Sequence, residues 1–221
     1  MDMIKIFLII SGIAGYILGS ISSAVILSKL VSGKDIREEG SGNAGATNML
    51  RTHGKKMGVL TLVFDLLKGV VAVLIARLFG NFIDNEFYAK LMPLVSGFFV
   101  IIGHNFPIFF GFRGGKGVAT SLGVILTLNY KVALFVAAIA ILIMALTRYV
   151  SLGSVLAGIL YVVFDLAYMF FTDTFYYPEL IFACLVGGLV VIRHRANIKR
   201  LKDGTESKLG EKKEVKEIFN L

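Results

Sequence analysis

Seven apolar segments alternate with shorter polar stretches along the chain. They cover residues 3–30, 58–80, 90–103, 116–129, 131–147, 152–171 and 177–193. A straight membrane-spanning helix needs about 20 apolar residues. The segments at 90–103 and 116–129 are shorter, so we expect them to be tilted, or to have glycine-rich ends that protein covers below the membrane surface. The pattern predicts an all-α polytopic membrane protein with seven transmembrane helices.

The composition agrees with this class of protein. Hydrophobic residues make up 56% of the 221 residues and charged residues only 17%, and the mean hydropathy is +0.78. A water-soluble globule is therefore not expected. The segment at 3–30 is too long for the apolar part of a cleavable signal peptide, and no A-x-A site follows it. We interpret it as the first membrane span.

The one cysteine and three histidines of the chain give little indication of a disulfide or a typical metal site. The single cysteine, Cys184, lies in an apolar run, so no internal disulfide can form. No Cys/His cluster has the spacing of metal ligands, so we expect no metal ion and no cofactor. The expected partner of so apolar a chain is the lipid bilayer and not nucleic acid.

Positive charge is divided unevenly between the two sides of the predicted membrane domain. One side receives residues 31–57, 104–115, 148–151 and 194–221. Together with the edges of the spans, that side holds 18 of the 23 Lys and Arg residues. The positive-inside rule therefore places the N-terminus outside and the C-terminus in the cytoplasm. We expect a single integral-membrane domain over 1–206 and a cytoplasmic tail over 207–221, where charges alternate.

Small and charged residues inside the first two spans predict how those helices pack. Gly12, Gly15 and Gly19 share one helix face, which is typical of close contact with another helix. Asp65 and Lys68 are three residues apart on one face of the second span. Because a lone charge in a membrane is costly, we expect this pair to neutralise each other or their neighbours in the bundle.

The first polar motif is GSGNAGATNMLR, residues 40–51. Its glycines allow the backbone to curl so that successive N–H groups point inward and form a nest for an anion. Arg51 adds a fixed positive charge that can grip a phosphate group with two hydrogen bonds. Further side-chain donors come from Ser41, Asn43, Thr47 and Asn48. The alternative is a simple Gly/Asn-rich turn.

The second motif is GHNFPIFFGFRGGKGVAT, residues 103–120. Lys116 lies between glycines, directly before an apolar helix, where unpaired N–H groups and the helix dipole favour an anion. The glycines concerned are Gly114, Gly115 and Gly117. The alternative is a basic loop that touches lipid headgroups.

The third motif is RHRANIKRLKDGTE, residues 193–206, at the end of the last span. If the helix continues, His194 and Asn197 lie roughly on one side of it. The alternative is an ordinary basic run on the cytoplasmic side of a span. A weaker element is RYVSLGS, residues 148–154, where helix capping by Ser151 is as good an explanation as contact with a ligand.

The predicted site is rich in donors and cations and poor in acids. Glu206 is its main candidate carboxylate, so the site suits two phosphate groups better than the carboxylate clusters of metal-dependent phosphatases. No cysteine lies nearby to form a thioester. The His-x₄-Asp pair of many acyltransferases is also absent, because no Asp stands five residues after any of the three histidines.

Residues 41–51, 103–120 and 194–206 resemble the three cytoplasmic motifs of the bacterial acyl-phosphate-dependent glycerol-3-phosphate acyltransferases, the PlsY family. The resemblance implies transfer of a fatty acyl group from acyl-phosphate to the 1-hydroxyl of glycerol 3-phosphate. The products would be lysophosphatidate and phosphate, in phospholipid biosynthesis. It also implies a protein of the bacterial inner membrane whose active site faces the cytoplasm, and we expect a monomer.

The resemblance also implies roles for individual residues. The catalytic residues would be Ser41, Thr47, Lys116, His194 and Asn197. The substrate-binding residues would be Gly42, Asn43, Gly45, Asn48, Arg51, Gly114, Gly115, Gly117, Ser154, Arg200 and Glu206. We further expect that the phosphate of the donor, and not a histidine, accepts the proton of the attacking hydroxyl.

Two other functions are compatible with parts of this pattern. A transporter of a phosphorylated anion also uses glycine-broken helices and cations near helix ends, but its site lies near the membrane midplane. A scaffold that binds anionic lipid would need only the basic charges and not their arrangement.

Overall fold

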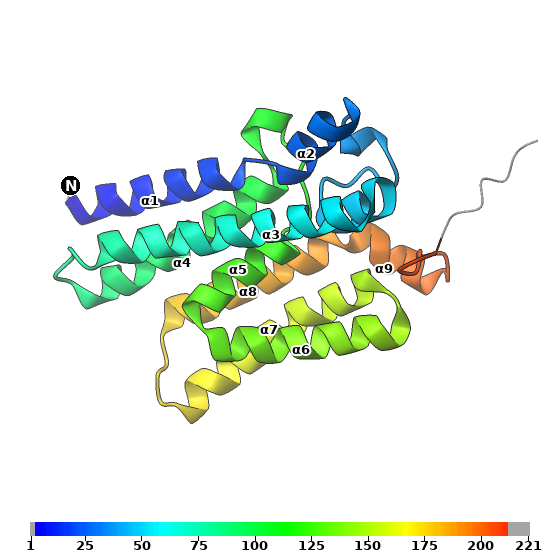
Figure 1. Cartoon of the computed structure of the whole chain (residues 1–221). Helices are drawn as coiled ribbons and strands as arrows, with labels where there is room; N and C mark the ends of the chain where they lie inside the picture. The colour runs from blue at the N-terminus through cyan, green and yellow to red at the C-terminus, as the bar shows by residue number, and fades with distance from the viewer. Residues whose placement is uncertain (1–2, 212–221) are drawn as a thin grey trace, which may run out of the picture.

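The computed structural model describes residues 3–211 of the chain, and the last part of the predicted tail, residues 212–221, lies outside the described residues. Every regular element in 3–211 is helical. The α-helices are α1 (Met3–Gly19), α2 (Ser23–Ser32), α3 (Ala46–Gly80), α4 (Glu86–Asn105), α5 (Val118–Leu128), α6 (Tyr130–Thr147), α7 (Val150–Phe171), α8 (Tyr177–Arg193) and α9 (Arg195–Lys202). Two short 3₁₀ turns, η1 (Ile36–Glu38) and η2 (Ile108–Phe110), lie in the loops. The long helices run along one another, and the chain reverses direction from each to the next (Figure 1).

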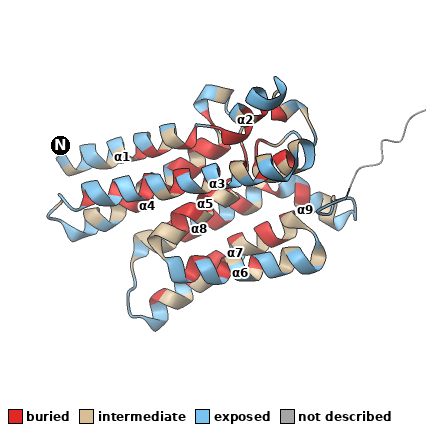
Figure 2. Cartoon of the chain, in the orientation of Figure 1, coloured by how far each residue is buried: buried red, intermediate tan, exposed pale blue. Residues whose placement is uncertain are grey.

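Five of the helical stretches in 3–211 are long and apolar enough to cross a membrane. They are Met3–Ser32, Ala46–Gly80, Glu86–Phe110, Tyr130–Thr147 and Val150–Phe171. A sixth is formed by α8 and α9 if this pair, bent by 56°, is counted as one span. Large apolar side chains are exposed on the outer faces of α1 and α6, while buried residues gather where helices meet, as expected in lipid (Figure 2).

The third and fourth apolar segments differ from each other in length. The prediction that the third segment is short was wrong, because α4 begins at Glu86 and has 20 residues. The fourth segment is short: α5 has 11 residues, about 16 Å of helix and roughly half of the hydrocarbon thickness. Thr120 and Ser121 in its first turns are buried, so protein covers this end of the helix.

Glycines set the closest helix contacts. The predicted packing of Gly12, Gly15 and Gly19 is confirmed, because a Cβ at any of them would crowd α4; at Gly19 it would overlap the backbone carbonyl of Val100. In the same way, a Cβ at Gly123 of α5 would overlap the carbonyl of Leu66 in α3. Such close backbone contacts give the van der Waals attraction that holds helices together in lipid.

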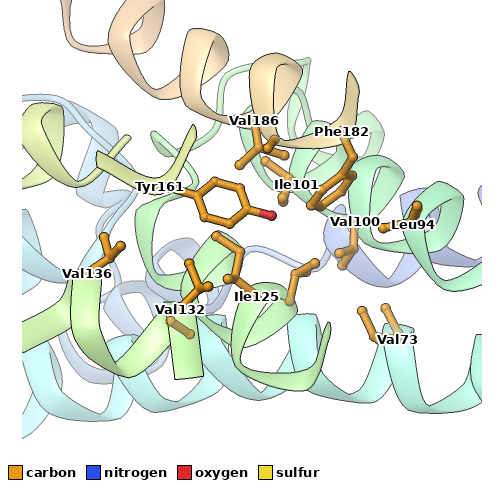
Figure 3. Close-up of a cluster of buried hydrophobic side chains, with 14 residues drawn as sticks. Val73, Leu94, Val100, Ile101, Ile125, Val132, Val136, Tyr161, Phe182 and Val186 are labelled. Atoms are coloured by element: carbon orange, nitrogen blue, oxygen red, sulfur yellow. The ribbon is translucent and has the colours of Figure 1, made fainter. Parts of the chain in front are cut away.

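The apolar core lies around α5 and includes side chains from α3, α4, α6, α7 and α8 (Figure 3). Val100 and Ile125 belong to it, and Tyr161 of α7 points into its centre. The short helix α5 is therefore held inside the bundle. Its first residues, Val118–Thr120, are also the last residues of the second polar motif, so the packing of α5 fixes that motif.

The first apolar segment is not one continuous helix. It breaks after Gly19, and α2 begins at Ser23. The break leaves backbone carbonyls without helical partners, which is tolerated in a membrane only where protein supplies donors. The ammonium group of Lys68 supplies them: Nζ donates to the carbonyl oxygens of Gly19 and Ile21, both at 3.1 Å.

All three polar motifs, with α2 and α9, lie at the end of the bundle opposite the first residue of α1 (Figure 1). This arrangement agrees with the prediction that the motifs share one side.

Candidate functional site

The first motif forms a tight loop that leads into α3. Gly40 and Gly42 have φ values of +58° and +70°, a conformation that glycine adopts without strain. Asn48 holds the loop from inside: its Nδ2 donates to the carbonyls of Ile36 and Glu39, and its Oδ1 accepts from the N–H of Ser41. Both amide hydrogens of Asn48 are therefore used to shape the loop.

The first loop ends at the N-terminus of α3. Gly45 is its N-cap, and no side chain caps the helix. The N–H of Asn48 in the first turn donates to the carbonyl of Gly45 at 3.1 Å. The N–H groups of Ala46 and Thr47 precede any helical acceptor, and the helix dipole favours an anion there. The side chains of Ser41, Asn43 and Thr47 make no hydrogen bond to other residues of 3–211. Their donors are therefore available at this helix end.

The second motif forms a loop with little space for side chains. A Cβ at Gly115 would overlap Nε2 of His104 and lie 2.8 Å from the carbonyl oxygen of Ala44. A Cβ at Gly114 would overlap the carbonyl oxygen of His104. Gly117 has φ +83° and is the N-cap of α5, again without a side-chain cap. A second uncapped helix N-terminus therefore lies at the same end of the bundle.

Two arginines tie the second loop to its neighbours. Arg193, the last residue of α8, donates from Nη2 to the carbonyl of Gly115 at 2.8 Å, and its guanidinium lies 4.9 Å from the ring centre of Phe106. Arg37 donates from Nη1 to the carbonyl of Phe110 at 2.6 Å, which joins the first loop to the second. The hydrogen bond from Arg37 also lowers the pKa of Asp35 to about 2.

The second and third motifs meet through Lys116 and Asn197. Lys116 Nζ donates to Oδ1 of Asn197, and Asn197 Nδ2 donates to Glu206 Oε1 at 2.6 Å. Glu206 also accepts from Ser151 Oγ at 2.7 Å and from Arg200 Nε at 2.7 Å. The carboxylate thus fixes Asn197 and Arg200, and Asn197 in turn orients the lysine.

Burial changes the acid–base behaviour of this network. It lowers the pKa of Lys116 to about 8; Glu206 opposes the shift, and the charges of Arg200, Arg51 and Arg193 add to it. Burial acts to raise the pKa of Glu206, but hydrogen bonds from Ser151, Asn197 and Arg200 outweigh it, so the net pKa is lowered. Glu206 is therefore an anion at neutral pH. The pKa of Lys116 lies only slightly above neutral pH.

His194 lies after the last residue of α8. Burial, with the positive charge of Lys116, lowers its pKa to about 4, so the ring is neutral at pH 7. Nδ1 lies 2.8 Å from the carbonyl oxygen of Val190 and must carry the proton to donate to it. Nε2 therefore keeps its lone pair and can accept a hydrogen bond from a ligand.

The structure brings most of the predicted residues into one place. Arg51 donates to the carbonyl of Ser207 at 3.1 Å, which joins the first motif to the residues after the third. Ser154 is less directly placed: it is buried, and its Oγ donates to Val150 of its own helix. Sequence reasoning did not assign Arg37, Arg193 or His104 to the site, because basic residues at span ends are expected from the positive-inside rule alone.

Fold and site together define a polytopic membrane protein with uncapped helix N-termini and several cations at one end of its helices. Comparison with known proteins gives its family. The sequence profile described as "Glycerol-3-phosphate acyltransferase" matches residues 9–204, and the chain belongs to this family. It is therefore an integral membrane acyltransferase of lipid biosynthesis.

Individual relatives support the assignment over nearly the whole chain. A glycerol-3-phosphate acyltransferase from Clostridioides difficile is 46% identical over 93% of this chain and 97% of its own length. One from Thermoanaerobacter pseudethanolicus is 42% identical over 95% of this chain and 100% of its own. The fold is similar to the crystal structure of PlsY (YgiH), an integral membrane glycerol 3-phosphate acyltransferase, in its glycerol 3-phosphate form. The TM-score is 0.81, with 39% identity over 92% of this chain and 96% of that one. The lysophosphatidic acid form of the same enzyme gives a TM-score of 0.77, with 38% identity over 92% of this chain and 95% of that one.

Proposed function

We propose that this protein transfers a fatty acyl group from acyl-phosphate to the 1-hydroxyl of glycerol 3-phosphate, and so forms lysophosphatidate and phosphate. The observation that carries the proposal is the convergence of two uncapped helix N-termini, at Gly45 and Gly117, with Lys116. Two phosphate-bearing substrates need two anion sites close together, and helix N-termini with adjacent cations are suited to both. The solved PlsY forms with glycerol 3-phosphate and lysophosphatidic acid support the acceptor and the product.

The proposed reaction needs positioning more than it needs a strong base. The hydroxyl oxygen attacks the carbonyl carbon of the mixed anhydride, and the ester C–O bond forms. The bond from that carbon to the phosphate oxygen breaks, and the phosphate leaves with the electron pair. The proton of the hydroxyl passes to the phosphate of the donor. Lys116, held by Asn197, stabilises the negative charge that develops, and Ser41 and Thr47 donate to the phosphate groups.

His194 aligns the hydroxyl in this scheme and does not take its proton. Its Nε2 lone pair can accept the hydroxyl hydrogen bond, because Nδ1–H is directed at the carbonyl of Val190. A general base is most effective when its pKa is near the working pH. The pKa of His194 is about 4, whereas the second pKa of a phosphate monoester is about 6. The phosphate of the substrate is the better acceptor.

The remaining predicted residues bind the two substrates or hold in place the residues that do. Arg51 and Arg200 supply positive charge beside Lys116. Asn48 and Glu206 act by shaping the first loop and by orienting Asn197. The other members of this set are Gly42, Asn43, Gly45, Gly114, Gly115, Gly117 and Ser154.

We expect the dependence of kcat/KM on pH to separate the roles of Lys116 and His194. The rate falls above about pH 8, because Lys116 loses its proton near its pKa of about 8, and Lys116→Arg moves this fall to higher pH. Any acidic limb lies near pH 6 and belongs to the substrate phosphate. His194→Gln lowers the rate but leaves that acidic limb in place. If His194→Gln removes the limb, the histidine is the proton acceptor.

We place the protein in the bacterial inner membrane as a monomer with seven passes. The short helix α5 is the fourth pass, the N-terminus is outside, and the active site faces the cytoplasm. Alternation of chain direction supports the seven passes (Figure 1), and the 18 of 23 Lys and Arg residues on one side support the orientation. We keep 1–206 as one membrane domain. The tail begins with residues that contact it, since Leu209 accepts from Arg148 at 2.8 Å.

The test of the proposed function is the release of phosphate by the purified protein from acyl-phosphate and glycerol 3-phosphate together, with lysophosphatidate measured in the same samples.

A further inference from the structure

A buried network of ionisable side chains lies beneath the site and takes no part in the proposed reaction. Lys68 Nζ is 3.0 Å from Asp65 Oδ1, which confirms the predicted ion pair. Ser23 Oγ donates to the same oxygen at 2.7 Å, and His104 Nδ1 lies 2.8 Å from Lys68 Nζ. Asp65, Lys68 and His104 are each less than a tenth exposed. Ionisable groups buried in a membrane protein are costly and commonly have a function.

The hydrogen bonds of this network determine which ring nitrogen of His104 carries the proton. The ammonium group of Lys68 can only donate, so His104 Nδ1 must present its lone pair at 2.8 Å. Nδ1 and Asp65 Oδ1 are 3.4 Å apart, which suits two acceptors that share a donor. The proton of the neutral ring is therefore on Nε2, on the side of the ring away from Lys68.

Nε2 of His104 faces the place where the two glycine-rich loops meet. A Cβ built on Gly115 would overlap this nitrogen and would lie 2.8 Å from the carbonyl oxygen of Ala44. Ala44 directly precedes Gly45, the N-cap of α3. The N–H of Gly115 also donates to the backbone carbonyl of His104 at 3.1 Å. His104 thus packs against the second loop at Gly115, where the carbonyl of Ala44 in the first loop also comes close.

Neutralising a charge does not explain the whole arrangement. The pair formed by Asp65 and Lys68 would be neutral without His104. Lys68 in addition binds the carbonyls of Gly19 and Ile21, where the first segment breaks. The network therefore connects four helices: the end of α1, the start of α2, and the middle of α3 are joined to the His104 ring of α4, which lies beside the second loop.

We propose that Asp65, Lys68 and His104 are positioning residues, which set the spacing of the two glycine-rich loops and thereby the affinity for glycerol 3-phosphate. The inference rests on the proposed function for the identity of the ligand. Lys68 acts through His104, and none of the three touches the reacting atoms. Binding of the acceptor should therefore suffer more than the chemical step.

The test uses two sets of variants in the full-length protein in detergent. Asp65→Asn combined with Lys68→Met removes both charges and leaves neither unpaired, so a purely neutralising role predicts wild-type kinetics. A positioning role predicts a rise of about tenfold or more in KM for glycerol 3-phosphate, with kcat changed less, because small displacements of binding groups have such effects. Ser96→Ala is the control, since it removes a buried hydrogen bond of 3.1 Å from α4 to Ala72 of α3 and should leave KM unchanged.

The second set replaces the ring itself. In His104→Gln, the side-chain amide can place its N–H group at the position of the His104 Nε2–H. In His104→Asn, the shorter side chain reaches only the position of Nδ1. We expect the Gln variant to keep KM closer to the wild type than the Asn variant. A wild-type KM in both variants, or in a folded Asp65→Asn/Lys68→Met protein, would overturn the inference. If the double variant does not fold, the KM values of the His104→Gln and His104→Asn variants test the inference alone.

Thermal stabilisation by inorganic phosphate is measured in parallel, because it needs no turnover. If phosphate stabilises a wild-type protein that does not catalyse the reaction, the proposed function fails. In that case, loss of this stabilisation in the His104→Asn protein still supports the positioning role, and unchanged stabilisation overturns it.

Discussion

Lys116→Ala is expected to lower the rate of phosphate release by about 10²- to 10³-fold, the usual effect of removing one preorganised group that stabilises a developing charge. Lys116 is mostly buried, donates to Asn197, and directly precedes Gly117, the uncapped N-terminus of α5. No other described lysine donates to Asn197, so the loss of Lys116 leaves this position without its ammonium group. Initial rates at saturating concentrations of both substrates measure the effect.

Arg113→Ala is the matched control, because it removes one positive charge from the same loop. The Arg113 side chain is exposed and makes no hydrogen bond or ion pair within 3–211. We expect its activity to stay within about threefold of the wild type, since exposed charges contribute little. If the two variants lose activity equally, only the net charge of the loop matters, as in a scaffold that binds anionic lipid.

Gly115→Ala is expected to abolish most of the activity because it lowers the affinity for glycerol 3-phosphate. The new methyl group would overlap Nε2 of His104 and press on the carbonyl of Ala44, so the two glycine-rich loops must separate. A displacement of about 1 Å in a site of this kind can cost about 100-fold in rate. Steady-state kinetics with glycerol 3-phosphate as the varied substrate, together with thermal unfolding, measure the effect.

Gly188→Ala provides the control for this substitution. Gly188 lies in α8, and a Cβ there would meet no atom within 4 Å. Alanine favours the helical conformation over glycine, so stability should be unchanged or slightly higher and the kinetics should match the wild type. Wild-type KM in Gly115→Ala would contradict the close approach of the two loops.

Apolar pattern and charge were sufficient to predict much of the fold. A run of about 20 apolar residues has few alternatives to a membrane helix, so the long segments were found as helices. Their bounds were less accurate: α3 begins at Ala46, 12 residues before the predicted start at 58, and the break after Gly19 was not predicted. The three motifs were found because glycines, amides and cations cluster in the polar stretches between apolar segments, and the predicted topology placed them on one side. Six of the seven segments have the length of a span if α8 and α9 count as one.

The sequence could not show which polar groups bind one another. Asn48 resembled a ligand donor, but its amide is used by the backbone of its own loop. The break after Gly19 depends on Lys68, which is 49 residues away along the chain. Arg193 resembled an ordinary basic residue at a span end, and only the fold brings it to the carbonyl of Gly115. These contacts are made between distant segments, and no local spacing predicts them.

The most direct measurement is phosphate release by the purified protein in detergent, with acyl-phosphate and glycerol 3-phosphate supplied separately and together. An acyl-phosphate-dependent acyltransferase releases phosphate only when both are present, and forms one lysophosphatidate for each phosphate. No release from the two substrates together, with uptake of glycerol 3-phosphate into vesicles that contain the protein, would contradict this function and would favour a transporter of phosphorylated anions.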